Sequence, residues 1–358
     1  MTRHNNGKPR RKRSTNPIND LPGLFDYLDI DLSQSEISNE SAPVRDRHIS
    51  QLADQQSLEI DTNKIKRPSS LRYISFGSGS SGNCSFIGLD NGDGRITGVL
   101  IDAGVEPKTV YEALKDNKID IKNISGILLT HDHGDHVKFI YPILRANKHM
   151  VVYTTMRTMS GLLRRHNISS RLKDYQRIIY IEHPFTAAKF NVTAFRTSHD
   201  GTENVGFAID TTDNSHRFVI ATDTGIITPE ADNYLKKANY IVIESNYDHR
   251  MLLDGPYAEF LKARIIGDRG HLDTKVTADY LKKIYNPAIS HIFLCHLSEE
   301  NNTPETALRQ TRDALLSLGL KIGDPANPLM AKDTDLALCV LPRKEVTPQF
   351  ILRHNKQG

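Results

Sequence analysis

The sequence has 358 residues and carries 46 Lys and Arg against 43 Asp and Glu, which gives a formal net charge of +3. This balance excludes the strongly basic surface that is typical of proteins that coat nucleic acid. The 3 cysteines lie far apart without a CxxC pair, so a zinc ribbon is excluded and a reducing compartment is favoured over a disulfide framework. No apolar run approaches the roughly 18 residues that cross a bilayer, and we expect a cytoplasmic protein without membrane partners.

Composition divides the chain near residue 70. Residues 1–67 are rich in Asn, Ser, Asp and Gln, contain only Phe25 and Tyr27 as aromatics, and show no sustained hydrophobic period. This composition is typical of disorder. We therefore predict a disordered polar tail over residues 1–67 and a globular domain over residues 71–358. A short basic cluster at residues 10–13 fits a solubilising tail better than a docking or nucleic-acid arm.

The predicted elements of the globular part alternate short strands with single helices. Two strands around a tight Gly- and Ser-rich connection open it, and apolar runs predict the later strands, at residues 71–76, 84–89, 99–101, 127–129, 150–153, 177–181, 190–196, 206–210, 218–222, 240–244 and 292–295. Helices are expected at 108–115, 274–285 and 303–318, the last with Thr303 as N-cap, Pro304 at the first helical position and Gly319 after its end. This order predicts a layered mixed α/β (α+β) sandwich.

A histidine-rich motif follows the apolar run at 127–129. His131, His133 and His136, with Asp132 and Asp135, fall within six positions, and Gly134 between them permits a tight loop. Imidazole nitrogens and carboxylate oxygens are ligands that Zn²⁺ takes in proteins. The motif therefore predicts a metal site, against the alternative of a solvated polar loop.

Three further candidate ligands stand where apolar strands end. His199 follows the strand at 190–196, Asp223 follows 218–222, and His296 follows 292–295. Layered folds commonly keep their sites in the loops at strand ends. We expect these side chains to join the histidine motif.

The order of these motifs along the chain resembles that of the metallo-β-lactamase fold of metal-dependent hydrolases. The motifs are HxHxDH, a lone His, a strand-terminal Asp with a following Gly, and a late His. Further motifs resemble its YycJ/WalJ-type branch, nuclease-like relatives of tRNase Z and ribonuclease J, and they lie at residues 76–83, 244–248, 255–257, 270–272 and 296–302. The resemblance extends over residues 71–345. It implies a four-layer αββα sandwich.

The resemblance also implies a role for each candidate ligand. One ion would be held by His131, His133 and His199, the other by Asp135, His136 and His296, with Asp223 bridging. Asp102, at the end of the strand at 99–101, would accept an N–H from a ligand histidine and so fix its tautomer. The alternative for Asp102 is a turn cap.

The same resemblance implies roles for residues outside the ligand set. His271 would give a proton or a hydrogen bond to the leaving oxygen, oriented by Glu244; alternatively it is an exposed loop residue. The family's usual Ser-Asn after Gly-His-Leu is here Asp273-Thr274, which leaves an N-cap but changes the loop. The candidates for substrate contact are Ser80, Ser81, Asn83, Asn301 and Asn302.

The function that follows is a phosphodiesterase with two divalent ions, Zn²⁺ or Mn²⁺, in which a metal-bridging hydroxide attacks phosphorus. Its substrate would be nucleic acid, DNA rather than RNA, and its activity that of a DNA exonuclease. Two alternatives remain open at this point, because one fold hosts many functions. The first is a metallo-hydrolase of a small phosphodiester, an ester or a lactam that uses the same site. The second is a metal-stabilised regulatory protein without turnover.

Overall fold

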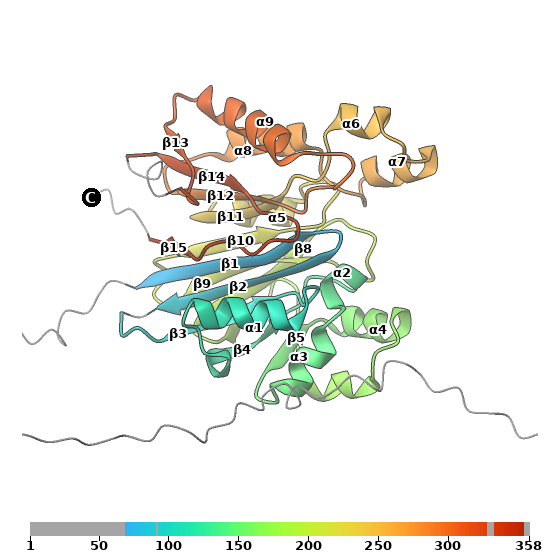
Figure 1. The fold of residues 1–358 in the computed structure, drawn as a ribbon, viewed down its shortest axis with the longest axis vertical. Coiled ribbons are helices and arrows are strands. Elements are labelled where there is room, and N and C mark those ends of the chain that lie inside the picture. The colour runs from blue at the N-terminus through green and yellow to red at the C-terminus, as the bar shows by residue number, and fades with distance from the viewer. Residues whose placement is uncertain (1–68, 91, 328–332, 354–358) are drawn as a thin grey trace, which may run out of the picture. The chain divides into compact units, whose positions relative to one another are not determined.

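The computed structural model describes residues 69–90, 92–327 and 333–353. Two twisted sheets lie face to face in the middle, with helices on both outer sides (Figure 1). The tail predicted over residues 1–67 lies outside the described residues, so it stays a prediction.

Within the described residues the first sheet has 7 strands and the second has 8. The first runs in the order β15 (Phe350–Leu352), β1 (Ser70–Gly79), β2 (Gly82–Asp90), β3 (Ile96–Ile101), β4 (Ile124–Leu128), β5 (Val151–Thr154) and β6 (Gln176–Ile178). The second runs in the order β13 (Ile322–Gly323), β14 (Leu336–Val340), β12 (His291–Cys295), β11 (Tyr240–Glu244), β10 (Arg217–Ala221), β9 (Val205–Thr211), β8 (Phe190–Arg196) and β7 (Phe185–Ala187).

The helices divide between the two outer faces (Figure 1). Those beside the first sheet are α1 (Pro107–Asp116), α2 (Gly134–Val137), α3 (Ile140–Ala146) and α4 (Met156–Arg165), with short 3₁₀ turns at Ile121–Asn123 and Ser170–Tyr175. Those beside the second sheet are α5 (Pro229–Leu235), α6 (His249–Asp254), α7 (Glu259–Ile266), α8 (Thr274–Ile284) and α9 (Pro304–Leu316).

Three separate hydrophobic clusters hold these layers together. Along β1, Leu71 and Tyr73 point between the sheets, whereas Ile74 and Phe76 point toward the first layer of helices, as the period of a strand requires. The central cluster is aromatic: the Tyr73 ring lies 5.1 Å from the ring of Phe218 in the opposite sheet. A third cluster packs α5, α8 and α9 on the second sheet. The predicted αββα sandwich is confirmed.

Most predicted elements are present with shifted ends. The opening hairpin pairs Gly79 with Gly82 around an exposed turn, and Thr303 caps α9 by accepting from the Thr306 amide. The predicted strand at 177–181 is shorter, as Gln176–Ile178, because only these residues pair with β5. The structure adds elements that were not predicted: α4, α7, β13 and β15 lack a strong apolar pattern, whereas β14 is an apolar run, LALCV, that was missed.

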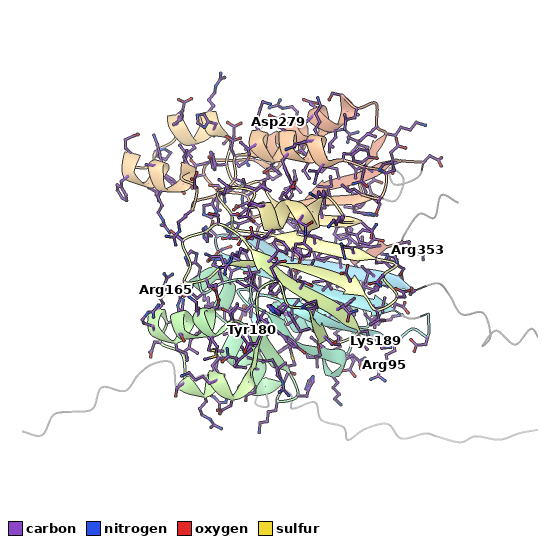
Figure 2. The ribbon with its side chains drawn as sticks, turned by 180° about the vertical axis from the view of Figure 1, so that it is seen from behind. Arg95, Arg165, Tyr180, Lys189, Asp279 and Arg353 are labelled. Atoms are coloured by element: carbon purple, nitrogen blue, oxygen red, sulfur yellow. The ribbon has the colours of Figure 1, made fainter. Side chains whose placement is uncertain are left out.

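The outer surface carries the charged side chains. Arg95, Lys189 and Arg353 point into solvent around the sheet ends (Figure 2). Over the described residues, no helix combines the length and the apolar character that a membrane crossing needs.

Candidate metal centre

Loops at the ends of β4, β8, β10 and β12 bring all the predicted ligands together. Their ligand atoms form two groups, each with all atoms within 4.8 Å of one another: His131, His133, His199 and Asp223, and Asp135, His136, Asp223 and His296. Asp223 belongs to both groups. This is the residue that the sequence motifs predict as the bridging ligand.

Unusual backbone angles turn three of the site residues inward. Asp102 and His296 directly follow β3 and β12, Asp223 lies two residues after the end of β10, and their φ angles are 60°, 53° and 51°, respectively. Residues other than glycine rarely adopt this left-handed conformation, and it persists only where surrounding structure enforces it. Such strained positions cluster at functional sites, and these three lie at the ends of one strand of the first sheet and two strands of the second.

The buried nitrogens of the site fit a metal ion. The Nε2 atoms of His131 and His296 are buried and have no hydrogen-bond partner among the residues that the structure describes. A buried polar group without a partner costs about 1–3 kcal/mol. A cation in each group would satisfy these two nitrogens, and neutral imidazoles with carboxylates are a donor set that Zn²⁺ and Mn²⁺ accept.

Electrostatics favour the metal-binding forms of Asp223 and His131. Burial raises the pKa of Asp223, but the charges of His296 and His136 outweigh this and hold its pKa well below the ordinary value. Burial and the charge of His136 lower the pKa of His131. An ionised carboxylate and a neutral imidazole are the forms that bind metal. For His136 and His296, burial lowers the pKa, but Asp223 and the other carboxylates beside them outweigh this and raise it.

Four of the ligand histidines have their second ring nitrogen bonded to an acceptor, which fixes the tautomer. The pairs are His131 Nδ1 with Thr130 Oγ1 at 3.0 Å, His136 Nδ1 with Asp102 Oδ2 at 2.7 Å, His199 Nδ1 with the Gly270 carbonyl at 2.9 Å, and His296 Nδ1 with Glu244 Oε1 at 2.8 Å. In each ring the other nitrogen, Nε2, is then unprotonated and able to bind an ion.

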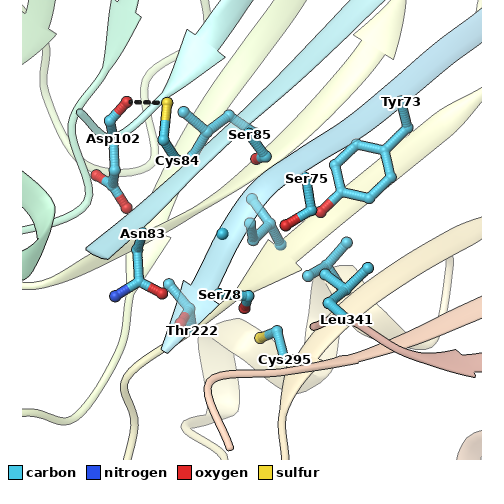
Figure 3. A pocket seen from close by; sticks show the side chains of 14 residues that line it. Tyr73, Ser75, Ser78, Asn83, Cys84, Ser85, Asp102, Thr222, Cys295 and Leu341 are labelled. Atoms are coloured by element: carbon cyan, nitrogen blue, oxygen red, sulfur yellow. Dashed lines mark hydrogen bonds between the residues drawn. The ribbon is translucent and has the colours of Figure 1, made fainter. Parts of the chain in front are cut away.

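Asp102 lies where the resemblance expects it. Besides His136, its carboxylate accepts from the amide and the hydroxyl of Thr130, at 2.9 Å and 3.0 Å for Oδ1. Its own carbonyl accepts from the Cys84 thiol (Figure 3). The residue therefore ties the histidine motif to the end of β3, which is more than a turn cap does.

Glu244 has a wider set of partners than the sequence indicates. It is fully buried, and its Oε1 lies 2.7 Å from His271 Nδ1 and 2.8 Å from His296 Nδ1. Its Oε2 accepts from the amides of Thr224 and Leu272. Burial raises the pKa of Glu244, but the charge and hydrogen bond of His271 outweigh this and lower it. One ionised carboxylate thus orients both a candidate ligand and His271.

The candidate substrate-binding residues fall in two kinds of environment. Ser80 and Ser81 form the exposed hairpin turn. Asn83 is buried, and its amide lies 3.0 Å from both Asp135 Oδ2 and His136 Nε2. Asn301 and Asn302 are also buried. Asn83 therefore faces the ligands, while the two later asparagines lie inside the loops that carry the site.

The amide of Asn302 is already used inside the protein. It donates to the carbonyls of Ser245 and Asn246 and to Thr274 Oγ1. These bonds join the loop after β11 to the start of α8. They favour a role in holding the loop over direct contact with a substrate.

A small polar cavity lies between the sheets behind the site (Figure 3). Its volume is about 20 Å³, enough for a single water molecule, which needs roughly 10–15 Å³. Ser75 lines it, and its buried Oγ has no hydrogen-bond partner within the described part of the chain. A water molecule there would satisfy this hydroxyl.

The sequence did not indicate several residues that support the site. The buried carboxylate of Asp132 accepts from the amide and the hydroxyl of Thr202, at 2.9 Å and 2.5 Å. Asp200 lies beside His133 and is paired with Arg264. Their partners lie 70 and 64 residues away, so no local pattern could identify them.

Comparison with known proteins agrees with this geometry. Residues 97–296 match the family model described as a β-lactamase superfamily domain. The chain is 31% identical over 254 residues to the exodeoxyribonuclease YycJ of Bacillus anthracis, which covers 71% of this chain and 92% of that protein. It is 28% identical over 252 residues to the exodeoxyribonuclease WalJ of Streptococcus pneumoniae, which covers 70% of this chain and 91% of that protein.

A solved structure of similar fold is the metallo-β-lactamase fold protein YhfI from Bacillus subtilis. The TM-score is 0.53 and the identity 14%, over 79% of this chain and all (100%) of that one. At this identity the match supports a shared fold and nothing further. Together with the family model and the relatives, it shows that the chain belongs to the β-lactamase superfamily and has the fold of its metallo-hydrolases.

Proposed function

We propose that the protein is a phosphodiesterase with two divalent metal ions that degrades DNA from an end. The observation that carries the proposal is the position of Asp223, whose carboxylate belongs to both groups of candidate ligands. Relatives at 31% and 28% identity are named exodeoxyribonucleases, which supports DNA as the substrate.

The two groups of ligands divide the ions between them. His131, His133 and His199 would hold one ion, and Asp135, His136 and His296 the other, with Asp223 shared. Two divalent ions in this arrangement would supply positive charge that stabilises both the attacking and the leaving oxygen of a phosphodiester.

Glu244 and His271 would serve proton transfer to the leaving group. Because Glu244 Oε1 accepts from His271 Nδ1, a proton stays on Nδ1 and the carboxylate stabilises the charged ring. The His271 ring lies 4.9 Å from the His199 ring and 5.2 Å from the His296 ring, between the two ligand groups. Its side chain is 21% exposed. Since Nδ1 is held by Glu244, Nε2 is the atom from which a leaving oxygen would take a proton.

A second candidate substrate is a small phosphodiester, because the net charge of +3 supplies little general attraction for a long polyanion. One assay distinguishes the two candidate substrates. Protein reconstituted with Mn²⁺ or Zn²⁺ is incubated with end-labelled single- and double-stranded DNA, RNA and bis(4-nitrophenyl) phosphate. We expect stepwise loss of nucleotides from one DNA end, and no degradation by His133→Ala.

Other outcomes of this assay would contradict the proposal. Cleavage of the small ester alone would favour the second candidate. Bound metal without turnover of any of these substrates would remove the phosphodiesterase proposal.

A further inference from the structure

Among the candidate ligand histidines, His133 differs in how its ring is held. The other four each have a hydrogen-bond acceptor on the nitrogen that points away from the ligand groups. The Nδ1 of His133 lies 3.2 Å from His199 Nε2, so this nitrogen faces the candidate metal position. Its Nε2 lies 3.1 Å from Asp200 Oδ1.

The two oxygens of Asp200 have different surroundings. Oδ2 accepts from Arg264 Nε at 2.8 Å and lies 2.6 Å from an Arg264 terminal nitrogen. Oδ1 is buried, and no described residue gives it an aligned hydrogen bond. Burial raises the pKa of Asp200, but the Arg264 hydrogen bond and the charges of His199 and Arg264 outweigh it and lower the pKa. Arg264 thus fixes one oxygen and leaves the other beside His133.

We propose that Asp200 is the positioning residue for His133 and that Arg264 of α7 holds it there. A hydrogen bond from the His133 Nε2–H to Asp200 Oδ1, across their 3.1 Å separation, would leave Nδ1 unprotonated and directed toward His131 and His199. This inference rests on the proposed function, since it takes His133 as a metal ligand. Partners of this kind fix the ring orientation of a ligand, and their loss lowers metal affinity by about 10- to 100-fold.

The surrounding loop explains why Asp200 is well placed for this task. It directly follows His199 in the chain, so one loop carries one ligand and orients a second. The segment after α7 holds this loop through two further bonds: Arg269 Nε donates to the His199 carbonyl at 3.2 Å, and Ser198 Oγ donates to the Asp268 carbonyl at 2.8 Å. The metal centre is therefore braced by α7, which supplies no ligand itself.

The test compares Zn²⁺ affinity in full-length variants by competition with a chromogenic chelator. We expect Asp200→Ala and Arg264→Ala to bind one of two ions about 10- to 100-fold more weakly than wild type. Asp200→Asn, which keeps an acceptor oxygen, should lose less. The control is Asp279→Ala, which removes an exposed carboxylate paired with Lys275 on the outer face of α8 (Figure 2) and should leave affinity unchanged.

A second readout separates positioning from a general effect on folding. In Zn²⁺-loaded protein labelled with ¹⁵N-histidine, wild type should give a slowly exchanging His133 Nε2–H signal, absent from His133→Ala. Asp200→Ala should lose that signal while its thermal unfolding without metal stays close to that of wild type. Wild-type affinity together with an unchanged signal in Asp200→Ala would overturn this inference alone. Unchanged Zn²⁺ affinity in His133→Ala would overturn both the inference and the ligand assignment that underlies the proposed function.

Discussion

At the scale of single residues, the site is defined by where protons reside. Each candidate ligand ring but one has an acceptor on one nitrogen, so the other nitrogen is the unprotonated one. Glu244 serves two rings at once with a single oxygen. The chemistry of the site therefore depends as much on acceptors behind the rings as on the rings themselves.

His271 is the residue whose replacement should separate proton transfer from metal binding. Its ring is held by Glu244 and belongs to a third group of possible ligand atoms, with Asp223, Glu244 and His296, which contains no residue of the histidine motif. Because His271 is not one of the predicted ligands, His271→Ala should keep the metal content of wild type. The rate of DNA degradation should fall by about 10²- to 10⁴-fold, as removal of a general acid does. Elemental analysis and initial rates check this, and loss of metal from the variant would refute the role of proton donor.

A different histidine should control acid stability. Burial lowers the pKa of His291 to about 4, whereas an exposed histidine has a pKa of about 6.5. As the pH falls below about 6.5, the unfolded chain takes up a proton that the folded chain refuses until about pH 4, so stability present above this window is lost within it. His291 lies at the start of β12, at the opposite end of that strand from His296.

The expected size of this effect is roughly 1–2 kcal/mol of the free energy of unfolding between pH 7 and pH 5. Denaturant unfolding at both pH values measures it in wild type and in His291→Phe, which keeps an aromatic ring beside Tyr240. The variant should show the smaller loss on acidification. An equal loss in both proteins would contradict the assignment to His291.

At the scale of elements, apolar runs located most strands because each buries at least one face. The motif around His131 was recognisable because its ligands follow one another directly. Asp200 and Arg264 were not, since their pairing depends on how α7 lies beside a loop 64 residues earlier. Nor does the sequence show that Asp223 and His296 adopt left-handed angles, because residues other than glycine rarely do.

The facing sheets make β10 a sensitive element. Phe218 is fully buried between them against Tyr73. Phe218→Ala should lower the free energy of unfolding by about 3–5 kcal/mol, through lost burial and the cavity left behind. Phe260 on α7 is 79% exposed, and Phe260→Ala should change the free energy of unfolding by less than about 0.5 kcal/mol. Chemical denaturation compares the two, and equal losses would contradict the packing described.

At the scale of the whole molecule, the two sheets present the ends of their strands at one edge, and ligands from both sheets meet there. The motif near β4 belongs to the first sheet, whereas Asp223 and His296 follow strands of the second. The metal centre therefore depends on the sandwich being assembled. The positions of the ligands at strand ends and the likeness to a known family predicted this meeting, whereas composition and periodicity predicted only layers.

The polar tail is the part of the molecule that we predict the chemistry does not need. It shows no sustained hydrophobic period, and none of its residues belongs to the predicted set of ligands. Deletion of residues 1–67 should leave the rate on short DNA substrates unchanged within about twofold, because this segment is predicted to lie outside the folded domain. Steady-state rates of the full and shortened chains check this, and an inactive shortened chain that still folds would contradict it.

The central claim is that side chains from both sheets hold two divalent ions that share Asp223. It is tested by elemental analysis of chelator-treated protein after reconstitution with Zn²⁺ or Mn²⁺ and removal of free metal. We predict two ions per chain in wild type and less than one in Asp223→Ala. Wild-type protein that retains only trace metal would contradict the account.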